Sequence, residues 1–158
     1  MRKPSPHRSP PRRRFDCVLV LALVVASAAC TDARNDLVAP ERVAAYRDKV
    51  ASLAAEDCRR HDTNVSAFGG PCTAASIRFH EAVGDLLATV PPTWEKQVLA
   101  IGGICRGQAY RYAQSELDRR SEADLLVEGL EAAPDCLEAQ FALLKDVARR
   151  EGVPVPGD

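Results

Sequence analysis

The sequence has little of what common catalytic and cofactor sites require. Histidine occurs three times in 158 residues, and only His61 and His80 follow the first 29 residues, so a serine or cysteine nucleophile has few possible bases. His80 and the glutamate after it begin like the zinc-protease helix, but Gly84 stands where the second histidine belongs. No Cys-x-x-Cys-His segment for haem attachment occurs. The sequence therefore predicts a protein that is not an enzyme and holds no cofactor.

Long apolar runs and a basic surface are also missing. The apolar stretch Cys17–Ala29 has 13 residues, whereas a membrane-spanning helix needs about 20. From residue 30 onward, 15 Lys and Arg stand against 21 Asp and Glu, a net charge of −6. Nucleic acid is not an expected partner, because binding it requires a basic stripe that displaces counterions from phosphate. With 46% apolar and 27% charged residues, the composition is that of one globular domain.

Residues 1–29 have the pattern of a signal peptide for export. Residues 1–15 carry six basic residues and no acid, and the apolar run that follows ends in small side chains. The segment Ser27-Ala28-Ala29-Cys30 resembles the lipobox of bacterial lipoproteins. The resemblance implies that Cys30 is acylated and becomes the N-terminus. It also implies that the domain lies outside the cytoplasm, anchored to the cell membrane or the outer membrane.

Ordinary signal-peptide cleavage after Ala28 is the alternative, and it would release the protein from the membrane. The parity of the cysteines favours lipidation. Cys17 leaves with the signal peptide, so ordinary cleavage would strand five of the six cysteines in the mature chain, one of them unpaired. Lipidation of Cys30 leaves four cysteines, which can all pair.

The rest of the chain predicts an all-α fold, a small bundle of four to five helices. We expect a lipidated tether over 30–39, a helical domain over 40–152 and a C-terminal tail over 153–158. Apolar residues recur at helical spacing in segments that start at Pro40, Thr73, Thr93, Ser121 and Asp135. Ser121 with Asp124 makes a capping pair and so predicts a break near Arg120, although one long helix remains an alternative.

Four cysteines of the expected domain are disulfide candidates, because an exported chain meets an oxidising compartment. Four cysteines allow three pairings. Cys58 ends one predicted helix and Cys72 starts the next, so an antiparallel hairpin brings both to one corner. Cys105 and Cys136 lie at about equal distances from the predicted break near Arg120, which places them at one height on two helices. Helical geometry therefore favours Cys58–Cys72 and Cys105–Cys136.

The remaining polar, aromatic and glycine residues each have a structural interpretation, and four of them also have an alternative interpretation as metal ligands. Cys58, His61, Cys72 and His80 could together bind zinc, but oxidation would consume the thiols. We interpret His80 as a core histidine with one hydrogen-bonded nitrogen, and Asp57 as a solvated residue at a helix end. Trp94, Tyr110 and Tyr112 are at helical spacing and are expected in the core. The glycines of that helix indicate close helix packing, at positions Gly102, Gly103 and Gly107.

The sequence thus predicts an exported lipoprotein that acts as a non-enzymatic interaction or structural component of the bacterial envelope. Its expected partners are the membrane, through the lipid, and another envelope protein. The alternative is a lipoprotein that binds a small ligand or a metal at a site between helices near His80 and Trp94.

Overall fold

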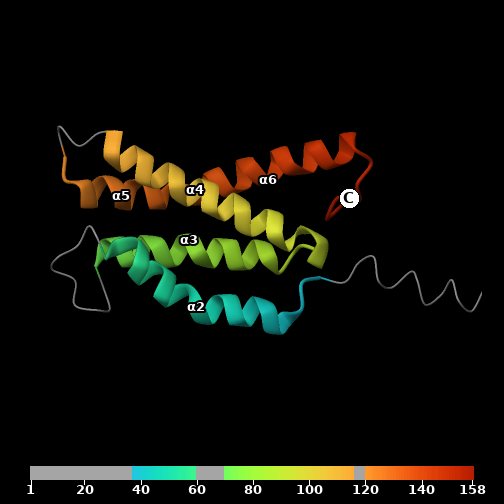
Figure 1. Cartoon of the computed structure of the whole chain (residues 1–158), viewed down its shortest axis with the longest axis horizontal. Coiled ribbons are helices and arrows are strands. Elements are labelled where there is room, and N and C mark those ends of the chain that lie inside the picture. Colours follow the sequence, from blue (N-terminus) through green and yellow to red (C-terminus); the bar gives the residue numbers. More distant parts are fainter. Residues whose placement is uncertain (1–36, 60–69, 116–119) are drawn as a thin grey trace, which may run out of the picture. The chain divides into compact units, whose positions relative to one another are not determined.

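The structure is a computed structural model that describes residues 37–59, 70–115 and 120–158. These residues contain five α-helices, one short 3-10 helix and no strand (Figure 1). The helices are α2 (Pro40–Cys58), α3 (Pro71–Leu87), η2 (Pro92–Trp94), α4 (Glu95–Ser115), α5 (Glu122–Glu131) and α6 (Ala133–Arg150). The predicted all-α fold is confirmed. None of these helices has the length and apolar character needed to cross a membrane.

Helices α2 and α3 form an antiparallel pair. Cys58 at the end of α2 is bonded to Cys72 at the start of α3. At the other end of the pair, the backbone N–H of Val38 donates to the carbonyl of Val90 at 2.8 Å. Val38 is buried, so the last residues of the expected tether pack against the domain.

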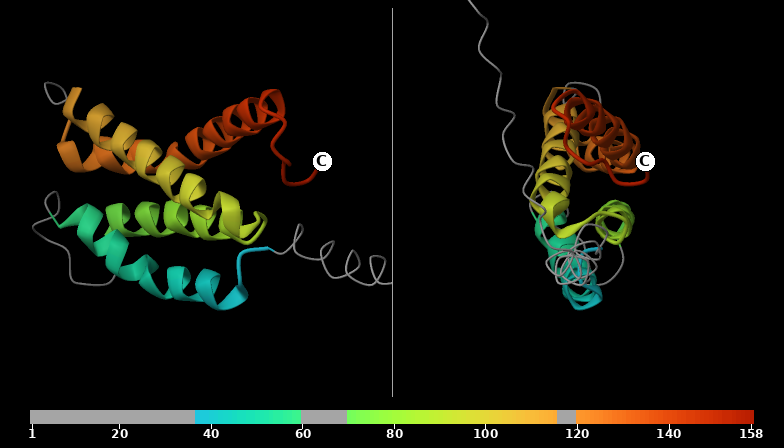
Figure 2. Two further views of the ribbon diagram at one scale, coloured as in Figure 1. Left: turned by 45° about the vertical axis from the view of Figure 1, so that its right-hand side comes forward. Right: turned by 90° about the vertical axis from the view of Figure 1, so that its right-hand side faces the viewer.

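Helices α5 and α6 follow one another along α4 (Figures 1 and 2). Pro134 explains why they are two helices, because it has no N–H to donate to the carbonyl of Leu130. Their direction is opposite to that of α4: Tyr112, late in α4, bonds Glu128 of α5, while Trp94 just before α4 packs edge-on against Phe141 of α6. The chain therefore reverses between α4 and α5, as the predicted break near Arg120 requires.

Helix α3 lies at the centre of the domain and contacts α2, α4, α5 and α6. Its buried side chains include Phe79 and Val83, which meet the apolar faces of the other helices in one continuous core. The largest fully buried residues of that core include Leu125, Leu126 and Leu130 of α5. The helices are thus held mainly by burial of apolar surface, at about 25 cal/mol per Å².

Both predicted disulfides are present. The Cα atoms of Cys58 and Cys72 are 5.9 Å apart, and those of Cys105 and Cys136 are 5.7 Å apart. The first bridge closes the α2–α3 hairpin and the second joins α4 to α6. The pairing chosen from helical geometry is confirmed. Because disulfides form and persist in oxidising surroundings, the bridges indicate a domain that resides outside the cytoplasm.

Prolines, rather than the predicted capping side chains, mark the starts of two helices. Helix α3 begins at Pro71, and Thr73 lies inside it; α6 begins at Ala133 with Pro134 in its first turn, ahead of Asp135. The fixed φ and missing N–H of proline suit a first turn without a side-chain cap. Thr93 caps no helix either, because it lies inside η2. The cap predicted at Ser121 is confirmed, since its Oγ accepts from the N–H of Asp124 at 3.2 Å.

Close helix packing is found at Gly102 and at one glycine that the sequence pattern did not indicate. A Cβ at Gly102 would lie 3.2 Å from Val83, whereas Gly103 has no neighbour within 4 Å and Gly107 meets only the end of Arg111. The tightest approach is at Gly129 of α5, where a Cβ would lie 2.9 Å from the Cα of Ala109. Only a hydrogen fits there, because backbone atoms of α4 fill the space.

We expect Gly129→Ala to destabilise the domain by about 1–3 kcal/mol, since the methyl group would force α5 away from α4. The gain of about 1 kcal/mol in helix propensity offsets only part of that cost. The measurement is urea unfolding followed by circular dichroism. Gly103→Ala is the matched control and should stabilise by about 0.5–1 kcal/mol, because its Cβ is unobstructed. Equal effects of the two changes would show that the α4–α5 contact is not as tight as described.

Candidate functional site

A buried carboxylate lies at the centre of the main polar cluster of the described residues. The side chain of Asp57, near the end of α2, is only 2% exposed. Its Oδ2 accepts from Ser76 Oγ at 2.6 Å and from His80 Nε2 at 3.1 Å. Its Oδ1 accepts from the Tyr110 hydroxyl at 3.0 Å and faces an Arg106 nitrogen at 3.5 Å. These residues, with Tyr46, are called the Asp57 network below.

Two helices supply the donors in matching pairs. Ser76 and His80 lie four residues apart on α3, and Arg106 and Tyr110 lie four residues apart on α4. Residues at this spacing share one face of a helix, so each pair points to the same place. The end of α2 brings Asp57 to that place between α3 and α4. The network therefore joins three helices through one carboxylate.

Both ring nitrogens of His80 are engaged. Nδ1 lies 3.0 Å from the Tyr46 hydroxyl, and Nε2 lies 3.1 Å from Asp57. A neutral ring with its hydrogen on Nε2 satisfies both bonds, because it donates to Asp57 and accepts from Tyr46. Phe79 packs against the ring, with centroids 5.0 Å apart. His80 is thus a core histidine, as predicted, but it has two hydrogen-bonded nitrogens where one was expected.

Burial, hydrogen bonds and nearby charges shift the pKa values of three groups in the Asp57 network. Burial pushes the pKa of Asp57 upward, but the hydrogen bonds from His80, Ser76 and Tyr110 outweigh it and leave this pKa below its ordinary value. Burial raises the pKa of Tyr46 to about 12, against the opposing influence of the Arg106 charge. Burial and then the charge of Asp57 raise the pKa of Tyr110 as well. At neutral pH the network holds an ionised Asp57 and two protonated tyrosines.

The order of the hydrogen bonds differs from that of a catalytic triad. In a triad the histidine lies between the carboxylate and the nucleophile and takes the nucleophile's proton. Here Ser76 donates to Asp57, and Tyr46 occupies the remaining nitrogen of His80. Ser76 has no exposed surface. The arrangement satisfies buried polar groups with one another and gives Ser76 no activating base.

The sequence interpretation of three residues needs correction or refinement. Asp57 is buried among four donors, so its interpretation as a solvated helix-end residue is wrong. Tyr112 is 38% exposed and bonds Glu128, so it is not a core residue. Trp94 is buried against Phe141, as expected for the core, and it does not line the cavity beside His80. The cavity beside His80 therefore does not include Trp94, the second residue named for the alternative ligand site.

A small cavity lies beside His80, between α2, α3 and α4. Its volume is about 170 Å³, and it is called the His80 cavity below. It is lined by Tyr46, Leu53, Phe79, His80, Val83, Leu99, Gly102, Gly103 and Arg106. A second and more polar cavity, of about 630 Å³, is lined by Glu56, Asp57 and Tyr110 among others. Arg106 lines both cavities.

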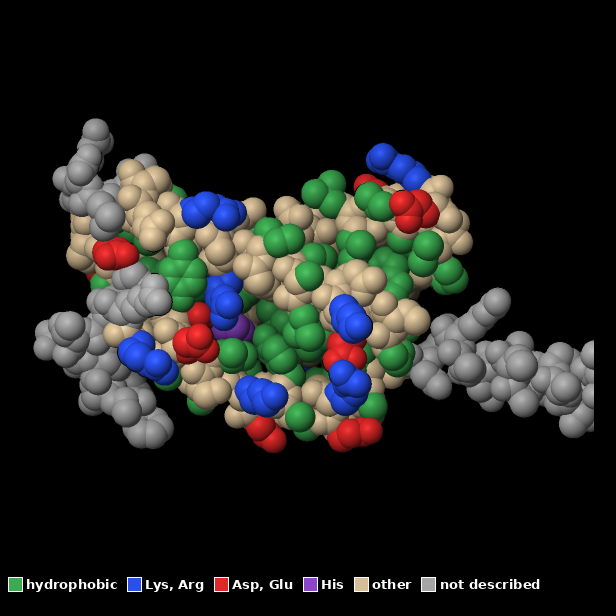
Figure 3. Space-filling view, in the orientation of Figure 1, with side chains coloured by type: hydrophobic (Ala, Val, Ile, Leu, Met, Phe, Trp, Pro, Cys, Tyr) green, Lys and Arg blue, Asp and Glu red, His purple; other side chains and the backbone are tan. Residues whose placement is uncertain are grey.

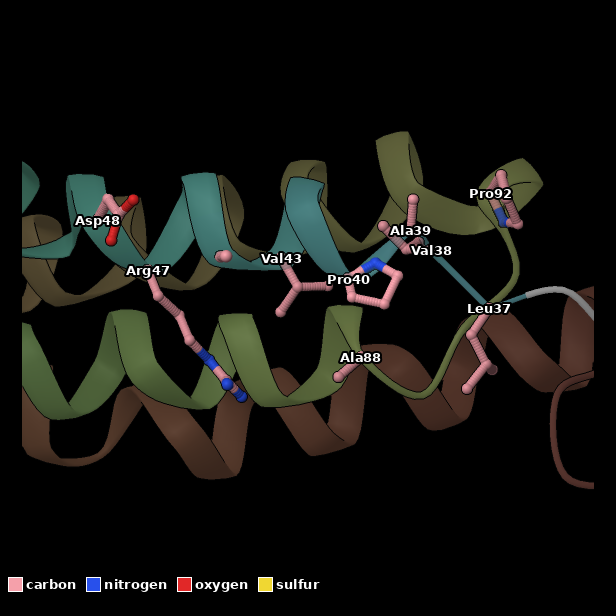
Figure 4. A pocket seen from close by; sticks show the side chains of 10 residues that line it. Leu37, Val38, Ala39, Pro40, Val43, Arg47, Asp48, Ala88 and Pro92 are labelled. Carbon is pink, nitrogen blue, oxygen red and sulfur yellow. The ribbon is translucent and has the colours of Figure 1, made fainter.

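A wider cavity of about 940 Å³ lies where the described chain begins (Figure 4). Its lining includes Leu37, Pro40, Val43, Ala88 and Pro92. Leu37 is 54% exposed. The cavity therefore has an exposed apolar side chain at the first described residue, and the charged Arg47 and Asp48 also line it.

The alternative interpretation of Cys58, His61, Cys72 and His80 as a zinc site does not fit the structure. The sulfurs of Cys58 and Cys72 are bonded to each other, so they offer no thiolate to a metal. His80 is bonded to Tyr46 and Asp57, and His61 lies outside the described residues. No group of three potential metal ligands was found in the part of the chain that the structure describes.

We expect the stability of the domain to fall with rising pH above about 10. An unfolded tyrosine has a pKa of about 10, whereas the folded pKa of Tyr46 is raised to about 12. The stability gained from keeping the phenol protonated is therefore complete below pH 10 and is lost as the pH rises through 12. The measurement is urea unfolding between pH 9 and 12.

The Tyr46→Phe variant should lose less stability than the wild type over the same alkaline range, because it has no phenol to ionise. Tyr112→Phe, at an exposed position, should follow the wild type. Parallel curves for the wild type and Tyr46→Phe would contradict the raised pKa.

The fold and the network define a small, disulfide-bonded, all-helical domain with a buried polar centre. The chain matches no protein-family model, no curated protein and no solved structure.

Proposed function

We propose that the chain is an exported bacterial lipoprotein, anchored to a membrane through Cys30. Its helical domain acts outside the cytoplasm as a non-enzymatic interaction component of the cell envelope. The pairing of Cys58 with Cys72 and of Cys105 with Cys136 carries this proposal. Because those four cysteines pair with one another, a chain cleaved before Cys30 has one further cysteine, at the position that the lipobox resemblance assigns to the lipid.

Two features of the domain support the anchored, non-enzymatic role. The Asp57 network uses its polar groups on one another and leaves Ser76 without a base. The exposed Leu37 lies seven residues after Cys30, so at about 3.6 Å per residue it is at most about 25 Å from the anchored residue. An apolar end is suited to a position near the lipid surface.

Cell fractionation of the wild type and of Cys30→Ala tests the anchor. The wild type should sediment with the membranes, and the variant should not, because two or more acyl chains are needed for firm attachment. Recovery of both proteins in the exported soluble fraction would contradict the anchor and favour ordinary cleavage. Cys17→Ala is the matched control, since it changes a cysteine that leaves with the signal peptide.

Crosslinking in intact cells tests the interaction role. The wild type should give a discrete crosslinked species that contains a second envelope protein. The same species should be weaker for Cys30→Ala, which leaves the membrane. Absence of any crosslinked species with the wild type would overturn the interaction role without affecting the anchor.

A second candidate function is binding of a small ligand, and the His80 cavity favours it. The cavity is smaller than the several hundred Å³ of sites for drug-sized molecules, so its ligand would have few atoms. Metal binding is not favoured in the same way, because Cys58 and Cys72 are bonded to each other and cannot serve as metal ligands.

A further inference from the structure

Two glycines of α4 line the His80 cavity. Gly102 and Gly103 face it where larger residues would fill it. A Cβ at Gly103 would meet no atom within 4 Å, and a Cβ at Gly102 would touch only Val83. Glycine in a helix interior costs about 1 kcal/mol relative to alanine. Gly103 is exposed, lines the cavity and has no packing contact that requires a glycine.

The walls of the cavity are mostly apolar. Leu53, Phe79, Val83 and Leu99 surround it, and Leu99 is 39% exposed. Figure 3 shows purple histidine atoms reaching the surface of the molecule, beside a group of hydrophobic side chains and with Lys or Arg side chains nearby. The cavity therefore lies at a face of the domain that solvent and solutes can reach.

Arg106 gives the cavity its charge. It is the one Lys, Arg, Asp or Glu among the lining residues. The described residues give its guanidinium one bond, to Asp57 at 3.5 Å, which is longer than a usual N–H···O bond. A guanidinium carries five N–H donors, and this side chain is 37% exposed. Arg106 therefore keeps donors for an anion.

The carboxylate of Asp57 does not line the His80 cavity. Asp57 is absent from the lining, and Ser76, His80 and Tyr110 already donate to its carboxylate. A ligand in the cavity thus meets one cation, the polar side chains of Tyr46 and His80, and walls that are otherwise apolar. A guanidinium binds carboxylates and phosphates with matching bidentate geometry, and the single charge of a monocarboxylate is less costly to desolvate in a small, mostly apolar cavity.

We propose that the His80 cavity binds a small monocarboxylate with a short apolar tail. The carboxylate accepts hydrogen bonds from Arg106, and the tail lies over Gly103 against Leu99 and Val83. The proposal gives a ligand class and a location to the second candidate function, on which it rests. It moves the expected site from His80 and Trp94 to His80 and Arg106.

Three compounds with one carbon skeleton test the proposal. Isovalerate, 3-methylbutan-1-ol and 3-methylbutylamine share a branched tail and differ in the charge of the polar end. They are titrated into the purified protein by ligand-observed NMR. Isovalerate should bind at least ten times more tightly than the alcohol, and the amine should bind most weakly. Equal binding of the three compounds would overturn the role of Arg106.

Two variants test separately the positive charge of Arg106 and the open volume of the cavity. Arg106→Gln should weaken isovalerate binding at least tenfold and remove the preference over the alcohol. Gly103→Leu should abolish binding of both compounds while the domain stays folded, because its side chain enters open space and favours the helix. Arg78→Gln is the matched control, since Arg78 pairs with Glu131 away from the cavity and should leave binding unchanged.

Wild-type binding by Gly103→Leu would overturn the location of the site. Absence of isovalerate binding to the wild type would overturn the proposal as a whole. Neither result would affect the membrane fractionation of Cys30→Ala, so failure of this proposal and failure of the anchored envelope role can be told apart.

Discussion

Asp57→Ala should destabilise the domain by about 3–5 kcal/mol. The change removes the acceptor of Ser76, His80 and Tyr110 and leaves those donors buried without partners. Domains of this size are stable by about 5–15 kcal/mol, so the loss is a large part of the total. The measurement is urea unfolding of the purified protein at pH 7.

Asp57→Asn provides a variant of the same size that should remain folded, with a smaller loss of about 2–3 kcal/mol. Asp85→Asn is the matched control. Asp85 forms an exposed ion pair with Arg47, and such pairs contribute about 1 kcal/mol or less. A loss at Asp57 no larger than that at Asp85 would show that the network does not support the fold.

The acid side of the stability curve gives an independent check on Asp57. Its folded pKa is lowered, so the stability it contributes is present above the unfolded value of about 3.9 and is lost as the pH falls through the folded value. Asp57→Asn should therefore lose less stability than the wild type below pH 4. If the stability of the wild type and of Asp57→Asn changed equally with pH down to pH 2, the lowered pKa would be contradicted.

Removal of both disulfides should cost the domain about 7 kcal/mol, the largest effect that we expect. In the chain-entropy model, the Cys58–Cys72 bridge, with a separation of 14 residues, contributes about 3 kcal/mol. The Cys105–Cys136 bridge, with a separation of 31 residues, contributes about 4 kcal/mol. A loss of this size is comparable with the whole stability of a small domain. The reduced protein should be largely unfolded at 37 °C.

Double variants separate the two bridges. Cys105→Ala with Cys136→Ala should lose somewhat more stability than Cys58→Ala with Cys72→Ala, because the longer loop gains more freedom in the unfolded chain. Circular dichroism with and without a dithiol reductant measures the effect. A reduced wild type that unfolds at the same urea concentration as the oxidised protein would contradict the structural role of the bridges.

The helices and the disulfides could be predicted because they depend on local spacing. Val43, Val50 and Ala54 recur at helical intervals, and prolines and the Ser121–Asp124 pair mark interruptions. Once the chain reversals were predicted, the cysteine pairs followed, because the two cysteines of each pair lie at the same level on neighbouring helices. The first residue of a helix was less predictable, because Pro71 begins α3 and Pro134 lies in the first turn of α6, and neither helix has a capping side chain.

The Asp57 network could not be predicted in the same way. A carboxylate near a helix end is usually solvated, and only the packing of α3 and α4 against that end buries Asp57. A signal was nevertheless available. Ser76 with His80, and Arg106 with Tyr110, put polar side chains four residues apart on two helices. Gly129 gave no such signal, because its close approach to Ala109 depends on the distance between two helices.

Intact mass spectrometry of the protein purified from the membrane fraction tests the central claim most directly. We expect a chain that begins at Cys30, carries the added mass of its lipid and gains the mass of four hydrogens on reduction, two for each bridge. A protein that carries no lipid, or one whose mass does not change on reduction, would contradict an anchored domain held together by oxidised cysteines.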